Sequence, residues 1–222
     1  GSAFFHRIAF FYPIFGLTTA FRGYLEGRGD LVYSSAAGLV MPDPQPGHFA
    51  LLDASKEEAM QAAIRAAGSE GDSVGGILET IVTGLPAGIG EPWFDSVESL
   101  LSHAVFSIGG VKGIEFGGGF SMACGSGSEV NDPFRMRDGR VVTATNHNGG
   151  INGGVTNGMP VTFTVTFKPT PSIAIPQDTV DLARMENCTV TVQGRHDPCI
   201  ALRPPPQWGP RPWPCGGCWT PR

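Results

Sequence analysis

The clearest alternation of hydrophobic and polar positions in the chain lies between residues 161 and 168. Val161, Phe163, Val165 and Phe167 alternate with three threonines, and the run ends at Lys168. A period of two is typical of a strand with one buried face. The pattern therefore predicts a half-buried strand whose two ends lie in a fixed relation to each other.

The segments at the two ends of this strand are candidates for binding an anion. The preceding run, residues 146–160, reads NHNGGINGGVTNGMP, and glycines at this density let main-chain N–H groups approach a phosphate or a flat ring. After the strand, Lys168 offers a positive charge and Thr170 and Ser172 offer hydroxyl donors. The glycines with this predicted role are Gly149, Gly150, Gly153 and Gly154. Simple turn geometry is the alternative for each glycine taken alone, and a solvated strand end is the alternative for Lys168.

A third candidate segment is GRHDPC, residues 194–199. It follows a second alternating run, residues 186–194, whose Cys188, Val190 and Val192 are expected to point inward. Arg195 suits a phosphate or carboxylate, and Asp197 has the chemistry to move a proton. Capping of a turn before Pro198 is the alternative role of Asp197.

Helical periodicity appears twice, and both stretches carry start signals. Ser55 and Glu58 fit a capping box for a helix over residues 56–67 that ends at Gly68. Asp95 with Glu98 is expected to cap a second helix, and His103 lies beside its apolar face, where packing or hydrogen bonding is more common than catalysis. The apolar stripe of the first helix is Met60, Ala63, Ile64 and Ala67, and that of the second is Val97, Leu100, Leu101, Ala104 and Val105.

Two further strands and a hairpin complete the expected elements. Residues 75–84 and 107–120 read as strands bounded by glycines. The Asp-Gly pair at 138–139 leads into RVVTAT and predicts a hairpin after the polar stretch 121–140.

The composition of the chain limits the kinds of partner that it is expected to bind. The chain has 222 residues and a net charge of −5, which argues against nucleic acid because phosphate backbones require a basic surface. No uninterrupted apolar run approaches the ~20 residues of a membrane span, so no membrane contact is expected. Five cysteines without a secretory signal predict reduced thiols and a cytoplasmic location. Cys215 and Cys218 form a C-x-x-C pair, but no further cysteine pair or histidine lies at the spacing of a zinc site, so no metal is expected.

Residues 49–203 resemble chorismate synthase, the flavin-dependent lyase that ends the shikimate pathway of aromatic amino acid biosynthesis. The resemblance rests on seven segments in the family's order, which is more specific than any single glycine motif. They are EGDSVGG (70–76), GLPAGIGEPWFDSVESLLSHAVFSI (84–108), VKGIEFGGGF (111–120), HNGGINGGVTNGMP (147–160), KPTPSI (168–173), TVDL (179–182) and GRHDPC (194–199).

The resemblance implies an α+β fold in which antiparallel sheets enclose helices in a β-α-β sandwich, here incomplete. It implies the anti-1,4-elimination of phosphate from 5-enolpyruvylshikimate-3-phosphate to give chorismate, with reduced FMN as cofactor, NADPH as a possible reductant and a homotetramer as the assembly. Arg195 and Asp197 are the implied catalytic residues. The implied flavin-binding residues are Gly109, Gly110, Gly153, Lys168, Pro169, Thr170, Pro171, Ser172 and Arg195.

The resemblance does not extend to the two ends of the chain. Residues 1–48 lack the family's ESHG, RRPG, RPxHAD and RGGG segments, and QPGHFA at 45–50 resembles the third of these only by coincidence. Residues 204–222 are rich in proline and tryptophan, which fits a shifted reading frame or, as an alternative, a proline-rich interaction tail. The chain is thus expected to have a divergent leader, a partial family domain and an aberrant tail. A catalytically inactive fragment that retains part of a flavin or phosphate site is the alternative function.

Overall fold

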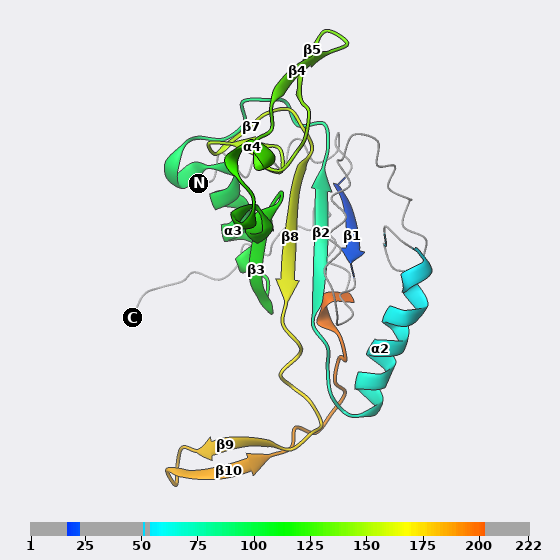
Figure 1. The fold of residues 1–222 in the computed structure, drawn as a ribbon. Coiled ribbons are helices and arrows are strands. Elements are labelled where there is room, and N and C mark those ends of the chain that lie inside the picture. Colours follow the sequence, from blue (N-terminus) through cyan, green and yellow to red (C-terminus); the bar gives the residue numbers. More distant parts are fainter. Residues whose placement is uncertain (1–16, 23–50, 52–53, 203–222) are drawn as a thin grey trace, which may run out of the picture.

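The central element of the fold is a four-stranded antiparallel sheet (Figure 1). In the computed structural model, the described residues are 17–22, 51 and 54–202. The strands lie in the order β1 (Leu17–Arg22), β2 (Gly76–Val82), β8 (Val161–Phe167) and β3 (Val111–Phe116). Together with the helices, this sheet confirms the expected α+β class.

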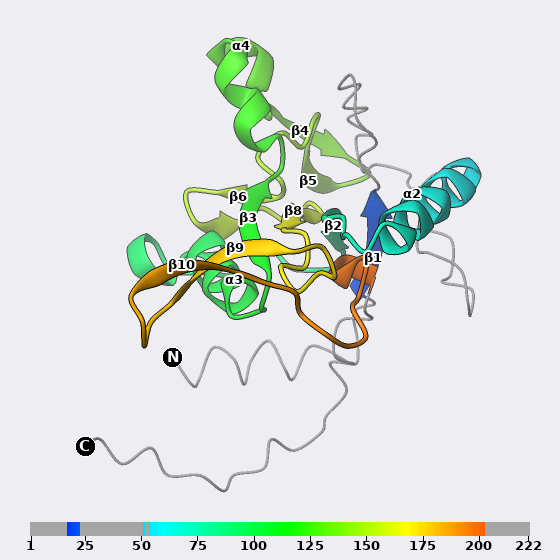
Figure 2. The ribbon, with the colours of Figure 1, turned by 90° about the horizontal axis from the view of Figure 1, so that it is seen from below.

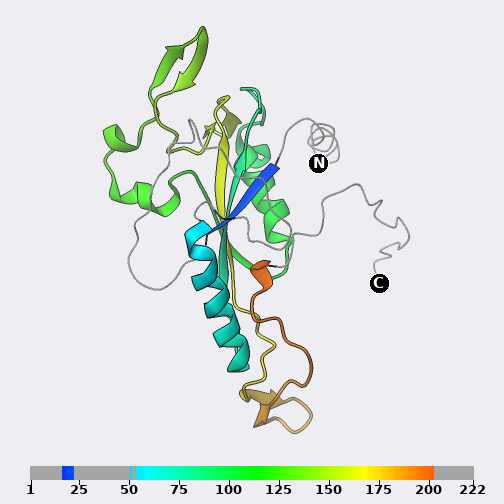
Figure 3. The same ribbon diagram turned by 90° about the vertical axis from the view of Figure 1, so that its right-hand side faces the viewer.

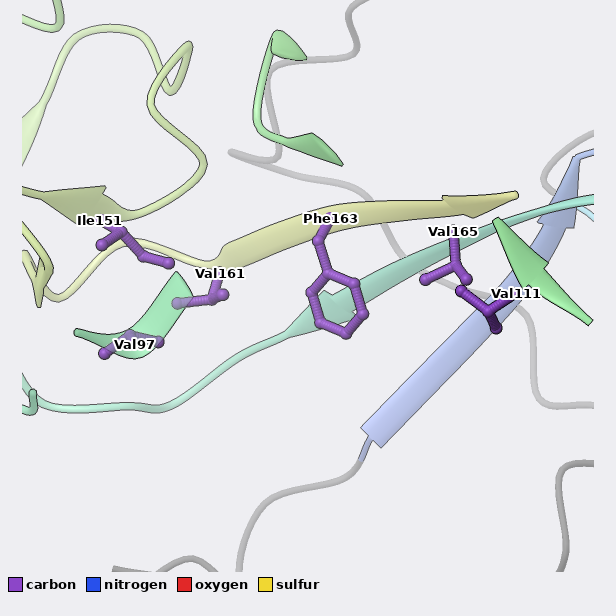
Figure 4. Packing of buried hydrophobic residues seen from close by; sticks show 6 residues of the cluster. All are labelled: Val97, Val111, Ile151, Val161, Phe163 and Val165. Carbon is purple, nitrogen blue, oxygen red and sulfur yellow. The ribbon is translucent and has the colours of Figure 1, made fainter. Parts of the chain in front are cut away.

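Strand β8 has the buried face that its alternation predicts. Val161, Phe163 and Val165 are 0%, 8% and 3% exposed, whereas the intervening threonines are half-buried or exposed. These three side chains pack with Val97, Val111 and Ile151 in one hydrophobic cluster (Figure 4). The strand therefore lies in the middle of the core and fixes the positions of the loops at its two ends.

Helix α3 (Val97–Phe106) lies beside β3, and helix α2 (Glu57–Ser69) lies on the β1 side of the sheet (Figure 1, Figure 2). The expected apolar stripes are confirmed, since α3 packs Val97, Leu101 and Val105 into the main cluster. Met60 of α2 forms a second cluster with Leu51, against which Leu78 and Ala201 pack. His103 is exposed on α3.

The helix ends differ from expectation. A 3-10 turn, η1 (Ala54–Lys56), leads into α2, so its N-cap is Lys56 and the predicted capping box of Ser55 and Glu58 is wrong. The predicted Asp95 cap of α3 is also wrong, because Asp95 belongs to the 3-10 turn η2 (Trp93–Asp95) and the Ser96 side chain accepts from the N–H of Ser99.

At its C-terminal end, α2 continues past Gly68, where it was expected to stop. Gly71 adopts a φ of 73°, and the N–H of Asp72 donates to the carbonyl of Ala67 at 2.9 Å while that of Gly71 donates to Gly68 at 3.2 Å. These two bonds form a Schellman motif, which turns the chain sharply from α2 toward β2.

Two hairpins extend from opposite ends of the sheet (Figure 1, Figure 3). One joins β4 (Phe134–Arg137) to β5 (Arg140–Thr143) and confirms the turn predicted at Asp138 and Gly139, whose φ angles of 50° and 73° are both positive. The other joins β9 (Gln177–Asp181) to β10 (Glu186–Val190). Every residue of β10 is exposed and Val192, just after it, is 36% exposed, so the inward orientation predicted for Cys188, Val190 and Val192 is wrong.

Short elements connect these parts. They are η3 (Gly119–Cys124), α4 (Gly127–Val130), η4 (Ile200–Leu202), and the two-residue strands β6 (Ile151–Asn152) and β7 (Val155–Thr156). Among the described residues, no helix has the length and apolar character needed to cross a membrane. The divergent leader, the proline-rich tail and the Cys215–Cys218 pair lie outside the described residues, apart from β1 in the leader.

Candidate functional site

Three of the predicted functional segments, residues 109–110, 168–172 and 195–197, meet at the end of β8 that carries Lys168. The main-chain N–H of Lys168 donates to the carbonyl of Gly110 at 2.9 Å, which continues the pairing of β8 with β3 by one residue. Gly109 and Gly110 therefore lie directly beside the start of the Lys168–Ser172 segment. This juxtaposition follows from the antiparallel register, in which Val111 pairs with Phe167.

The segment between α2 and β2 supports the Lys168–Ser172 segment from another side. The Ser73 hydroxyl donates to the carbonyl of Thr170 at 2.7 Å, and the N–H of Ala174 donates to the carbonyl of Gly71 at 2.9 Å. A Cβ at Gly75 would lie 2.6 Å from the carbonyl oxygen of Phe167, so only glycine permits this approach. Ser73 was not predicted as a site residue, although its segment was among those that resemble the family.

The Arg195–Asp197 segment forms the third side of the site. The N–H of Val74 donates to the carbonyl of Pro198 at 2.8 Å, and the imidazole Nδ1 of His196 lies 3.4 Å from the Ser172 hydroxyl. Arg195 is exposed and Asp197 is half-buried. Three stretches that are far apart in sequence are thus held together by main-chain and side-chain hydrogen bonds.

The side chains at the Lys168 end of β8 have the chemistry to bind an anionic ligand. Lys168 is half-buried and Arg195 exposed, and both are cations. The Thr170 hydroxyl oxygen is buried without a hydrogen-bond partner among the described residues, and a buried unsatisfied hydroxyl costs about 1–3 kcal/mol. A Cβ at Gly109 would meet no atom within 4 Å, so there is open space beside the main chain at this position.

Gly153 is the one residue of the implied flavin-binding set that lies elsewhere. It is in the turn between β6 and β7, beyond the Val161 end of β8, and the six residue steps from Val161 to Phe167 span about 20 Å. The structure therefore brings together the predicted site residues of 109–110, 168–172 and 195–197 but not Gly153.

Three glycines of the glycine-rich loop lie in close contact with neighbouring segments. A Cβ at Gly149 would lie 2.5 Å from the N of Gly117, and one at Gly150 would lie 2.4 Å from the carbonyl oxygen of Pro160. Gly154 is equally enclosed, with Ser96 Cβ at 2.7 Å. The turn-geometry alternative thus describes the surroundings of these three glycines, whereas Gly153 has no atom within 4 Å of its Cβ position.

A buried carboxylate, which was not predicted from the sequence, holds the start of this loop. Asp132 accepts hydrogen bonds from the main-chain N–H groups of His147 and Asn148 at 2.8 and 2.7 Å, from the Asn148 amide at 2.8 Å and from the Thr145 hydroxyl at 2.7 Å. Its side chain is 1% exposed, and its Oδ1 is 3.2 Å from His147 Nδ1. No periodicity marks this residue, because its donors follow it by 13–16 positions.

These hydrogen bonds determine the ionisation of Asp132. Burial raises the pKa of its carboxyl, but the hydrogen bonds from Asn148, Thr145 and His147 outweigh burial and hold the pKa below its ordinary value of 3.8. A lowered pKa means that the carboxylate stabilises the folded state fully above the unfolded-state value and that this stabilisation is lost as the pH falls through the folded-state value.

We therefore expect the difference in unfolding free energy between the natural chain and Asp132→Asn to shrink as the pH is lowered below 3.8. Asparagine does not titrate, so the variant should lose less stability over this range. Urea denaturation of both proteins at a series of pH values measures the effect, and parallel pH profiles would contradict it.

The fold and this site define the chain as an α+β protein with its candidate ligand groups at one end of an antiparallel sheet. A family model described as chorismate synthase matches residues 28–206. The chain belongs to the chorismate synthase family.

Individual relatives agree with this assignment. The chain is 53% identical to chorismate synthase of Korarchaeum cryptofilum over 144 residues, 65% of this chain and 40% of that protein. It is 50% identical to that of Opitutus terrae over 153 residues, 69% of this chain and 42% of that protein. A crystal structure of chorismate synthase superimposes with a TM-score of 0.52 at 33% identity, covering 55% of this chain and 37% of that one. The chain thus spans about two fifths of the length of the relatives it matches.

Proposed function

We propose that the chain takes part in the chorismate synthase reaction, the anti-1,4-elimination of phosphate from 5-enolpyruvylshikimate-3-phosphate to give chorismate. The observation that carries this proposal is the convergence of residues 109–110, 168–172 and 195–197 at one end of β8 in a chain of this family. The reaction class is a carbon-oxygen lyase acting on a phosphate ester. A cytoplasmic location and a homotetrameric assembly belong to the same proposal.

The residues at this end fit a flavin mononucleotide. The buried hydroxyl of Thr170 has no hydrogen-bond partner among the described residues, and Lys168 and Ser172 add a cation and a second hydroxyl on the same segment. The open side of Gly109 leaves space for a flat ring beside the main chain. Bound reduced FMN would supply the electron density that the elimination borrows and returns. Gly153 lies at the opposite end of β8 from these residues, and its contact with the flavin stays a prediction.

The Arg195–Asp197 segment is proposed to bind the anionic substrate and to handle the proton. Arg195 is exposed and can bind the anionic groups of the substrate or the flavin phosphate through charge-assisted hydrogen bonds. Asp197, half-buried beside the site, is positioned on the same segment to hold or move a proton. The protein's part is to bind the polyanion, orient it and exclude water.

A titration of the purified chain with chemically reduced FMN under anaerobic conditions, with and without 5-enolpyruvylshikimate-3-phosphate, tests the proposal. Release of phosphate and appearance of chorismate are followed in the same samples. A parallel reaction with oxidised FMN and NADPH asks whether NADPH can serve as reductant. If neither binding nor turnover is found, the chain is the inactive fragment and the proposal fails.

We expect Arg195→Ala to weaken reduced FMN or substrate binding by about 10- to 100-fold, because a hydrogen bond to a charged group contributes about 1.5–3 kcal/mol. Asp197→Asn should abolish turnover while leaving binding within a few-fold. Arg137→Ala is the matched control, since Arg137 is exposed on the hairpin at the opposite end of the sheet. Equal effects of the two arginine substitutions would exclude a specific role of Arg195.

A further inference from the structure

His196 connects two of the segments that form the candidate site, and none of the roles above uses it. Its Nε2 lies 3.1 Å from the carbonyl oxygen of Val192, and its Nδ1 lies 3.4 Å from the Ser172 hydroxyl. Because a carbonyl oxygen only accepts hydrogen bonds, Nε2 must carry the proton. In a neutral ring Nδ1 is then an acceptor, and the Ser172 hydroxyl donates to it.

This arrangement fixes both segments relative to each other. The Lys168–Ser172 segment is held through its main chain by Ser73, which donates to the Thr170 carbonyl, and by the Gln177 side-chain amide, which donates to the Pro171 carbonyl at 3.1 Å. Ser172 and His196 form a side-chain contact between this segment and residues 195–197. The bond from His196 to Val192 closes a short loop around Arg195.

We propose that His196, with the proton on Nε2, is a positioning residue that sets the location of Arg195 and Asp197 relative to Lys168. Small displacements in a binding site matter because ligand groups must be held within about 0.5 Å of the productive geometry. Without the imidazole, residues 192–197 lose the hydrogen bonds of His196 to Ser172 and to the Val192 carbonyl, and Arg195 no longer faces the same anion as Lys168. The two hydrogen bonds of His196, to Ser172 and to the Val192 carbonyl, are called the bridge below. This inference rests on the proposed function for the identity of the anion but not for the geometry of the bridge.

The bridge itself is tested without any ligand. Nitrogen-15 NMR of the histidine rings at a pH of about 8, where an ordinary histidine is neutral, distinguishes the two tautomers. We expect the His196 signals to show Nε2–H, with His196→Gln identifying the resonance. A predominant Nδ1–H tautomer would overturn the proposal. This result stands whether or not the chain binds FMN.

Two conservative variants separate the two hydrogen bonds. His196→Gln can keep a donor near the Val192 carbonyl but loses the acceptor for Ser172, whereas His196→Asn can keep an acceptor near Ser172 but loses the donor. In a double-mutant cycle on unfolding midpoints, Ser172→Ala should add little in the His196→Gln background and more in the His196→Asn background. Equal effects of Ser172→Ala in both backgrounds would contradict the bridge.

The positioning role is tested by anaerobic titration with reduced FMN. We expect His196→Gln to weaken binding about 10-fold, and Arg195→Ala to add much less than its full effect in the His196→Gln background, because the arginine is already displaced. Fully additive losses would show that His196 does not act through Arg195. Absence of FMN binding in the natural chain would instead contradict the proposed function and with it the positioning role, while the NMR and Ser172 results would still decide the bridge.

Discussion

Replacing Asp132 by alanine is expected to lower the free energy of unfolding by about 3 kcal/mol or more. The side chain is 1% exposed, and its removal leaves two main-chain N–H groups, an amide and a hydroxyl without their acceptor. Each buried donor left unsatisfied costs about 1–3 kcal/mol, reduced where water can enter the vacated space. Urea denaturation followed by circular dichroism measures the change in midpoint and slope.

The matched control is Asp178→Ala. Asp178 is exposed on β9, so its loss should change the unfolding free energy by no more than about 0.5 kcal/mol. Similar losses for the two variants would show that the donors around Asp132 find other acceptors. Asp132→Asn should lie between them, because an amide oxygen can accept some of the same bonds but carries no charge.

The parts of the fold that could be predicted from sequence are those set by short-range periodicity. The alternation of β8 gave the correct buried face because the strand lies in the middle of the sheet, between β2 and β3, where one face is covered. The apolar stripe of α3 also gave the correct buried face, since Val97, Leu101 and Val105 pack in the main cluster. The same alternation failed for β10, since period two indicates two faces but not whether anything packs against either of them.

Helix boundaries could not be predicted from capping motifs alone. Ser55 has the right spacing to Glu58, yet a preceding 3-10 turn moves the N-cap to Lys56. Ser96 and Asp95 are both good capping residues, but Asp95 lies in the 3-10 turn that begins at Trp93, and Ser96 is the N-cap. Such choices depend on how the chain enters the helix, which local sequence does not specify.

The candidate site was predictable as a set of segments but not as an arrangement. Residues 168–172 and 195–197 were recognised by chemistry and by family resemblance, yet Ser73, 97 positions before the Thr170 carbonyl that it holds, gave no signal of its own. Gly153 and Lys168 were expected at one ligand, although they lie at opposite ends of β8.

Phe163→Ala is expected to destabilise the fold by about 3–5 kcal/mol, the usual range for a buried phenylalanine. Phe163 is 8% exposed at the centre of β8, and its ring centroid is 5.7 Å from that of Phe116 on the neighbouring strand. The space left behind would open between Val161 and Val165, which flank Phe163 along β8 (Figure 4), and their β-branched side chains have little rotamer freedom to fill it.

Phe120→Ala is the matched control, because the same side chain is removed from a position that is 85% exposed. It should change the unfolding free energy by no more than about 0.5 kcal/mol. Because β8 also places Lys168 beside Gly110, we expect Phe163→Ala to weaken any anion binding at that end of the sheet, and Phe120→Ala to leave it unchanged. If Phe163→Ala proved no more destabilising than Phe120→Ala, β8 would not be the central strand of the core.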